Sequence, residues 1–258
     1  MSSFLSQITH DSISLEKSVS EFNIESVVIG IRYTSVLLSN GSCGVAYTLT
    51  DQSEEKNRHN EYLSEKFLYE KDLEYLVEFC ASKYSIFRGI GVAALNAFSQ
   101  ANLPSLNTEN LDILDIFKEK SGNISMIGNI QPVTRFLSQK GYQIKILDRF
   151  APPQPHSKIT IVDGISDLRN AEHLIVSGSA LVFETFDLVR DLLTTIPGEK
   201  VLLGPSAQIL PAIAFKHGFT FLGSSKIINA KSVMRIIMEG GGYRAFKEFT
   251  QKYSFHLE

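Results

Sequence analysis

The chain has 258 residues, of which 43% are hydrophobic and 21% charged, so it can bury a sizeable core and favours two domains over one. The formal net charge of −3 and the pI of about 6.1 give no basic surface, and we expect neither nucleic acid nor membrane as a partner. No apolar run reaches the roughly 18 residues of a membrane span, and the opening stretch lacks the pattern of a signal peptide. With two cysteines no disulfide framework is expected, and we predict a cytoplasmic location.

The first third of the chain predicts a helix and a hairpin. Apolar residues over 4–22 have the spacing of an amphipathic helix, with a break expected near Asp11. Two β-rich runs within 26–49 flank the sequence SNGS, and Asn40-Gly41 is the dipeptide that favours a type I′ turn. The polar residues 50–66 are expected to form a loop or an exposed helix.

Two further helices complete the first half. Residues 70–82 place Leu73, Leu76, Val77 and Cys80 on one face, which predicts an amphipathic helix. Residues 84–100 are small and apolar almost all round, which is typical of a buried helix, and the sequence NLP ends it at 102–104. This half therefore reads as an α+β unit.

From residue 122 onward, short apolar runs alternate mostly with helix-like segments, the pattern of βαβ units and a parallel sheet. The runs are continuous rather than alternating, as in strands that are covered on both faces. We expect a domain boundary within 107–123, which gives an α+β domain at 1–115 and a Rossmann-like α/β domain at 116–258. The six predicted strands cover 123–129, 143–150, 158–164, 173–179, 200–206 and 219–225.

Three strand ends carry small polar residues. If the six strands take the order 3-2-1-4-5-6, the first and fourth strands meet at the point where ligands bind in such sheets. The three corners are Gly128-Asn129, Ser177–Ala180 and Gly204-Pro205-Ser206. Each is expected to precede a helix N-terminus with unpaired N–H groups that attract an anion or a polar ligand. The alternative is that these residues are ordinary turns and helix caps.

Acidic residues near the corners have two interpretations each. Asp148 ends the second strand, where it can bind a ribose hydroxyl or simply pair with Arg149 in solvent. The first turn has Gly128 but no G-x-G-x-x-G motif, which argues against NAD and FAD. Glu184 and Asp187 suit a helix N-terminus, and Glu184 is alternatively a cation ligand or a base.

Signatures of catalysis and of metal binding are scarce. The motifs C-x-x-C, H-E-x-x-H, Walker A and G-x-S-x-G are absent, and no two of the six histidines have metal-ligand spacing. His217 before a glycine suits a helix C-terminus, and Cys80 suits a core position. Cys43 follows the hairpin turn, where its thiol can be exposed. A reactive or metal-binding role is then the alternative to a purely structural one. Asn96 in the buried helix requires partners, either structural ones or a ligand.

The glycines at 240–242, followed by Tyr243, are expected to stop a helix and act as a hinge, or to let the chain pass close to a ligand.

Taken together, these motifs resemble the heavy-metal chelation domain family. The matching stretches are GIRYTSVLLSNGSCGVAYTL, GIGVAALNAF, SMIGNIQPVTRFL, LIVSGSALVFETFDLV, VLLGPSAQILPAIAFKHGFTFLGSSKI and IMEGGGYRAFKEF. The resemblance implies an enolase N-terminal-like domain, a Rossmann-like domain and a cleft between them. It also marks 177–180 and 204–206 as characteristic segments. The sequence has Glu184 where the family pattern has Asn, and Asp148 where Glu is common.

The leading hypothesis is a small-molecule or metal-complex binding protein, with its ligand at the strand ends and the N-terminal domain closing over it. Two scattered cysteines suit thiolate chelation poorly, so a transition metal carried by an organic chelator is favoured over a bare ion. The alternative is an enzyme, a transferase or lyase for an anionic substrate with Glu184 or Asp148 as base. A third class is a structural interaction protein. Cys43 and Glu184 are the candidate metal ligands, and the candidate ligand-binding residues are Asn96, Gly128, Asn129, Asp148, Ser177, Gly178, Ser179, Thr185, Gly204, Pro205 and Ser206.

Overall fold

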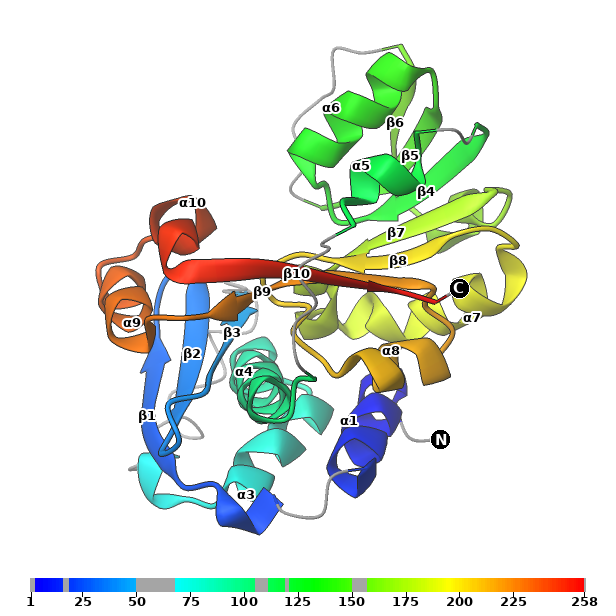
Figure 1. Cartoon of the computed structure of the whole chain (residues 1–258). Helices are drawn as coiled ribbons and strands as arrows, with labels where there is room; N and C mark the ends of the chain where they lie inside the picture. The colour runs from blue at the N-terminus through cyan, green and yellow to red at the C-terminus, as the bar shows by residue number, and fades with distance from the viewer. Residues whose placement is uncertain are drawn as a thin grey trace.

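The computed structural model describes residues 3–15, 19–49, 68–104, 111–118, 121–149 and 157–257, without the side chains of residues 15, 69, 184 and 185. It has a three-stranded antiparallel sheet and a seven-stranded, mostly parallel sheet, with helices against both (Figure 1). The mixed α/β class predicted from the sequence is confirmed. The predicted loop or exposed helix at 50–66 lies outside the described residues.

Helix α1 (Phe4–Leu15) runs through Asp11 without interruption, so the break predicted there is wrong. The polar side chain of Asp11 points to residues of another helix and leaves the backbone of α1 undisturbed. Phe4, Leu5 and Ile8 are buried, as the amphipathic spacing predicts. The short 3-10 helix η1 (Val19–Glu21) follows.

The small sheet has the order β1 (Ile24–Ile29), β2 (Tyr33–Leu38) and β3 (Cys43–Tyr47). The predicted hairpin joins β2 and β3, but its turn is not type I′. The N–H of Gly41 bonds the carbonyl of Leu38, and the N–H of Leu38 bonds the carbonyl of Ser42, both at 2.9 Å. These bonds define a three-residue loop in which Gly41 has φ of +85°. The side chain of Asn40 accepts the N–H of Ser42 instead of occupying the centre of a tighter turn.

The helices of the first half confirm the sequence prediction. They are η2 (Leu68–Glu70), α3 (Leu73–Glu78), η3 (Phe79–Ala81) and α4 (Ser85–Ala101). The predicted apolar face of α3 and η3 is buried, and α4 is buried along nearly its whole length. A Cβ atom at Gly44 would lie 2.1 Å from the backbone nitrogen of Ala97, so β3 lies directly on α4.

The large sheet has the order β10-β9-β8-β7-β4-β5-β6. All strands except β10 are parallel, and they are the six predicted strands in the predicted order. They are β4 (Asn123–Ile127), β5 (Gln143–Leu147), β6 (Ile159–Val162), β7 (His173–Ser177), β8 (Lys200–Leu203) and β9 (Phe221–Ile227). An unpredicted strand, β10 (Thr250–His256), pairs antiparallel with β9. The switch between β4 and β7 is therefore where the sequence placed it.

The segments that connect the strands of the large sheet differ from the prediction more than the strands do. A regular helix directly follows only the first of the three corners, where α6 (Gln131–Lys140) begins after β4. After β7 the chain forms the 3-10 segments η5 (Gly178–Val182) and η6 (Glu184–Leu188) before α7 (Val189–Thr195). After β8 the short α8 (Pro211–Lys216) begins well beyond the corner. The prediction that a helix N-terminus follows each of the three corners is therefore wrong. Two further short segments are α5 (Ile113–Ile116), before β4, and η4 (Ile165–Leu168), between β6 and β7.

The C-terminal segment returns to the small sheet (Figure 1). Helix α9 (Ala230–Met238), α10 (Tyr243–Phe246) and η7 (Lys247–Phe249) precede β10, and residues of α9 and α10 form one core cluster with β2 and β3. Gly240, with φ of +81°, ends α9, which confirms the predicted helix stop. The larger core cluster spans both halves of the chain. The predicted two-domain division stays a prediction. Among the described residues, no helix is both long and apolar enough to span a bilayer.

Candidate functional site

The first corner is a polar turn at the end of β4. Gly128 has φ of +76° there, in the left-handed region that favours glycine. The backbone N–H of Asn129 donates to Asp148 Oδ2 at 2.8 Å, and Asn129 Oδ1 accepts from Thr134 Oγ1 at 3.0 Å. The remaining group, Asn129 Nδ2, is buried without a hydrogen-bond partner among the described residues. This corner therefore presents an unused donor.

The second corner lies directly against the first. Ser177 Oγ and Ser179 Oγ are hydrogen-bonded at 2.9 Å, and both residues are half-buried. A Cβ atom at Gly128 would lie 2.8 Å from the Cβ of Ser177 and 3.6 Å from Ser179 Oγ. The topological switch therefore brings together Gly128, Asn129, Asp148, Ser177 and Ser179. We call these five residues the strand-end crevice.

The third corner turns toward the protein interior. Ser206 is 1% exposed, and its Oγ accepts the backbone N–H of Tyr47 at 3.0 Å. Asn96 Nδ2 donates to the carbonyl of Ser206 and to that of Val45, each at 2.8 Å. Gly178 also lies inside, because a Cβ atom there would be 2.4 Å from the nitrogen of Ala207. Asn96 and Ser206 thus join α4, β3 and the corner to one another.

Two residues that the sequence analysis did not select complete this connection. Gln208 is fully buried; its Oε1 accepts the N–H of Val45 at 2.9 Å, and its Nε2 donates to the carbonyl of Ser225 at 2.6 Å. Arg88 on α4 donates from Nε to the carbonyl of Val182 at 2.6 Å. Both residues could have been selected from the sequence, because a glutamine inside an otherwise apolar run and an arginine inside a buried helix each require polar partners. We call Arg88, Asn96, Ser206 and Gln208 the polar joint.

Of the acidic residues Glu184 and Asp187 after β7, the second makes a structural hydrogen bond. Asp187 Oδ1 accepts the backbone N–H of Phe4 at 2.5 Å, at the N-terminus of α1 rather than that of its own helix. The rings of Phe4 and Phe186 stack beside this contact, with centroids 5.2 Å apart. The side chains of the candidates Glu184 and Thr185 lie outside the described part of the structure.

Both cysteines are unsuited to binding a metal. Cys43 is 1% exposed, so the exposed position expected for it is wrong, because its side chain faces the core between β3 and α9. Burial raises the pKa of Cys43 to about 12 and that of Cys80 to about 12 as well. A metal binds the thiolate, which burial suppresses here. Within the described ranges, no group of three or more His, Cys, Asp or Glu side chains is placed to hold a metal ion.

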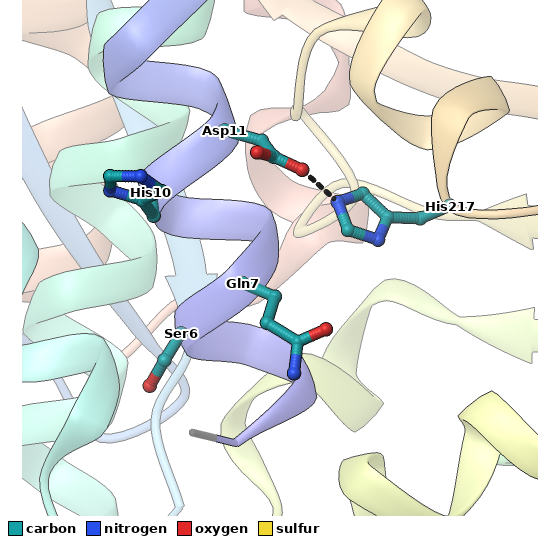
Figure 2. A pocket seen from close by; sticks show the side chains of 5 residues that line it. All are labelled: Ser6, Gln7, His10, Asp11 and His217. Atoms are coloured by element: carbon teal, nitrogen blue, oxygen red, sulfur yellow. Dashed lines mark hydrogen bonds and ion pairs between the residues drawn. The ribbon is translucent and has the colours of Figure 1, made fainter. Parts of the chain in front are cut away.

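A separate pocket between α1 and the end of α8 is lined by Ser6, Gln7, His10, Asp11 and His217 (Figure 2). Asp11 Oδ2 contacts His217 Nε2 at 2.8 Å and Lys216 Nζ at 3.0 Å. The hydrogen bond from Lys216 lowers the pKa of Asp11, and burial lowers the pKa of His217 despite the attraction of Asp11. Figure 2 shows His10 pointing to the other side of α1, away from this pair. The pair ties α1 to α8, and His217 also caps α8, as its place in the sequence predicts.

Fold and site together define a mixed α/β protein with a cluster of polar residues at the switch point of its large sheet. Residues 110–256 match the DUF364 family and residues 14–99 match DUF4213, both described as "Putative heavy-metal chelation". The first match covers more than half of the chain, and the protein belongs to the DUF364 family. The resemblance found in the sequence is thereby confirmed. The likeness of the N-terminal half to the enolase N-terminal domain stays a prediction.

Relatives match nearly the whole length of the chain. An uncharacterized protein of Methanocaldococcus jannaschii is 28% identical over 257 residues, which is 95% of this chain and 94% of that protein. A protein of unknown function from Pyrococcus horikoshii has a TM-score of 0.79 at 24% identity, with 98% of this chain and 99% of that chain covered. Another from Desulfitobacterium hafniense has a TM-score of 0.76 at 15% identity, with 98% of both chains covered. Both solved structures support the fold.

Proposed function

We propose that the protein binds a small molecule or a metal complex in the strand-end crevice. The observation that carries this proposal is the side chain of Asn129, whose buried Nδ2 has no partner among the described residues. The adjacent residue Gly128 packs against Ser177 and Ser179, whose hydroxyls are hydrogen-bonded to each other, and has no room for a side chain of its own. Buried donors are rarely left unpaired, so a ligand oxygen is a suitable partner.

The donor set favours an organic ligand over a bare ion. Amide and hydroxyl groups recognise carbonyl, carboxylate or hydroxyl oxygens by hydrogen bonds, whereas a soft transition metal prefers thiolate or imidazole. Both cysteines are buried with raised pKa values, and the described residues form no metal-binding cluster of His, Cys, Asp or Glu. We therefore infer that a metal would arrive within a chelator whose oxygen atoms the crevice binds. A cytoplasmic location is part of this proposal.

The N-terminal half would serve as a fixed wall rather than as a closing lid. Gln208 and Ser206 bond the outer edge of β3 through buried contacts of 2.9 and 3.0 Å, and Arg88 bonds η5. Opening the two halves would expose these groups and the shared apolar core. A preformed crevice lowers the ordering cost of binding.

A thermal-shift screen with Ni²⁺, Co²⁺ and Zn²⁺, each alone and as its citrate or histidine complex, tests the proposal. We expect a complex to raise Tm more than the same ion alone. Ser179→Trp should fill the crevice and abolish the shift, whereas Ser166→Trp, at an exposed position after β6, should preserve it. No shift with any probe, or an equal shift in both variants, would refute binding in the crevice.

The enzyme hypothesis receives no comparable support. Asp148, one of its two candidate bases, already accepts the N–H of Asn129 as a structural hydrogen bond. Glu184, the other, has a side chain outside the described residues. We therefore do not propose a reaction.

A further inference from the structure

A buried polar seam lies between α4 and the Gly204–Ser206 corner. Asn96 and Gln100 are one turn apart on α4, and 0% and 4% of their surface is exposed. Asn96 Nδ2 donates to the carbonyl of Ser206 at 2.8 Å, and Gln100 Nε2 donates to Tyr253 Oη at 3.1 Å. The carbonyl oxygens of both amides, Asn96 Oδ1 and Gln100 Oε1, are buried and lack a partner among the described residues. Two acceptors on one helix face are therefore unsatisfied.

Hydrogen bonds and strand pairing connect both amides with residues near the same corner. Asn96 reaches Ser206 directly. Tyr253, the partner of Gln100, is paired across β10 and β9 with Ser224, whose hydroxyl donates to the carbonyl of Gly204 at 2.8 Å. Asn96 therefore contacts the corner itself, and Gln100 contacts the strand next to the one that bonds the corner.

Rotating the amide of Asn96 does not resolve the deficit. Its nitrogen donates to the carbonyls of Val45 and Ser206, each at 2.8 Å, and rotation would set its oxygen against both. The nitrogen position is therefore fixed, and Oδ1 must accept from another donor. Buried acceptors in folded proteins almost always have such a donor.

We propose that one internal water molecule binds in this seam and donates its two hydrogens to Asn96 Oδ1 and Gln100 Oε1. Side chains four residues apart on a helix have Cβ atoms about 5–6 Å apart. One water with hydrogen bonds of about 2.8 Å joins oxygens up to about 5.6 Å apart, a separation that two side chains on neighbouring turns can adopt. Water is the occupant because both acceptors are neutral amide oxygens, whereas a bare Ca²⁺ or Mg²⁺ ion requires about six oxygen ligands. The water completes the hydrogen bonding beside the polar joint and is independent of the proposed ligand crevice.

Crystal structures of the full chain and of its Gln100→Met variant, at a resolution that resolves ordered water, test this site. Methionine keeps the length of the side chain and removes both polar atoms. We expect a density peak about 2.7–3.2 Å from both oxygens in the wild type. Its occupancy should fall below half in Gln100→Met and stay unchanged in Gln139→Met, a control on the exposed face of α6.

Three results would overturn the proposal. They are an empty seam in the wild-type map, a rotated Gln100 amide whose Oε1 accepts from Tyr253, and a peak with about six short oxygen contacts, which would identify a cation. If Gln100→Met does not fold, the wild-type map decides alone.

Discussion

At Gly128 the backbone has φ of +76°, and a methyl group would lie 2.8 Å from the Cβ of Ser177. A side chain at position 128 would therefore meet both backbone strain and crowding, and this position joins the two corners of the crevice. In the sequence, Gly128 was visible as a turn residue after an apolar run. Its closeness to Ser177, 49 positions away, follows only from the strand order.

Gly128→Ala is expected to destabilise the protein and to close the crevice. A left-handed backbone costs a non-glycine residue about 1–3 kcal/mol, and the contact with Ser177 adds to this. Gly141→Ala is the matched control, since φ there is +105° and the nearest atom is the flexible Lys158 Nζ at 3.5 Å. Urea unfolding should rank Gly128→Ala as the less stable variant; equal losses would exclude crowding at Ser177.

At the scale of elements, the polar joint explains how the edge of β3 is protected. Gln208, Ser206 and Asn96 supply side-chain hydrogen bonds along the edge of β3 that faces them. The sequence showed these residues as polar positions in apolar surroundings, and Asn96 was correctly expected to need partners. Their partners lie 51–163 positions away, a separation that no local pattern encodes.

Gln208→Met should weaken this connection. The buried N–H of Val45 and the carbonyl of Ser225 would each lose a partner, at a cost of about 1–3 kcal/mol per unsatisfied group. Gln139→Met, on the exposed face of α6, should change the free energy of unfolding by less than about 0.5 kcal/mol. Chemical denaturation measures both; a Gln208→Met variant as stable as this control would contradict the role of the joint.

Helix α1 should make the protein sensitive to acid. The pKa values of His217 and Asp11 are both lowered in the folded state, so the unfolded chain binds more protons as the pH falls. Stability should therefore decline below about pH 6.5, where unfolded histidine begins to take up its proton, and fall further as Asp11 protonates.

Urea midpoints at pH 7.5 and 5.5 measure this dependence. His217→Asn should reduce the loss of stability between these two values, because asparagine does not titrate. His10→Asn, at a side chain that points away from the Asp11–His217 pair, should leave the loss unchanged (Figure 2). A wild-type protein that is equally stable at both values would contradict the assignment.

For the whole molecule, the sequence predicts the large sheet well and its C-terminal completion poorly. Continuous apolar runs such as 173–177 and 200–203 favour covered strands, and the small residues after them mark their ends. Strand β10 escapes prediction because its residues, TQKYSFH, are mostly polar. The return of α9 and α10 to the small sheet depends on packing between distant segments.

The central claim is that the strand-end crevice holds a ligand. The most direct measurement is a crystal structure of the protein purified from its native organism without removal of bound metal, with elemental analysis of the same sample. We predict density for an oxygen-bearing molecule within hydrogen-bond distance of Asn129 Nδ2 and of Ser177 or Ser179. A crevice filled by the protein's own side chains, or a metal bound elsewhere in the chain, would contradict the account.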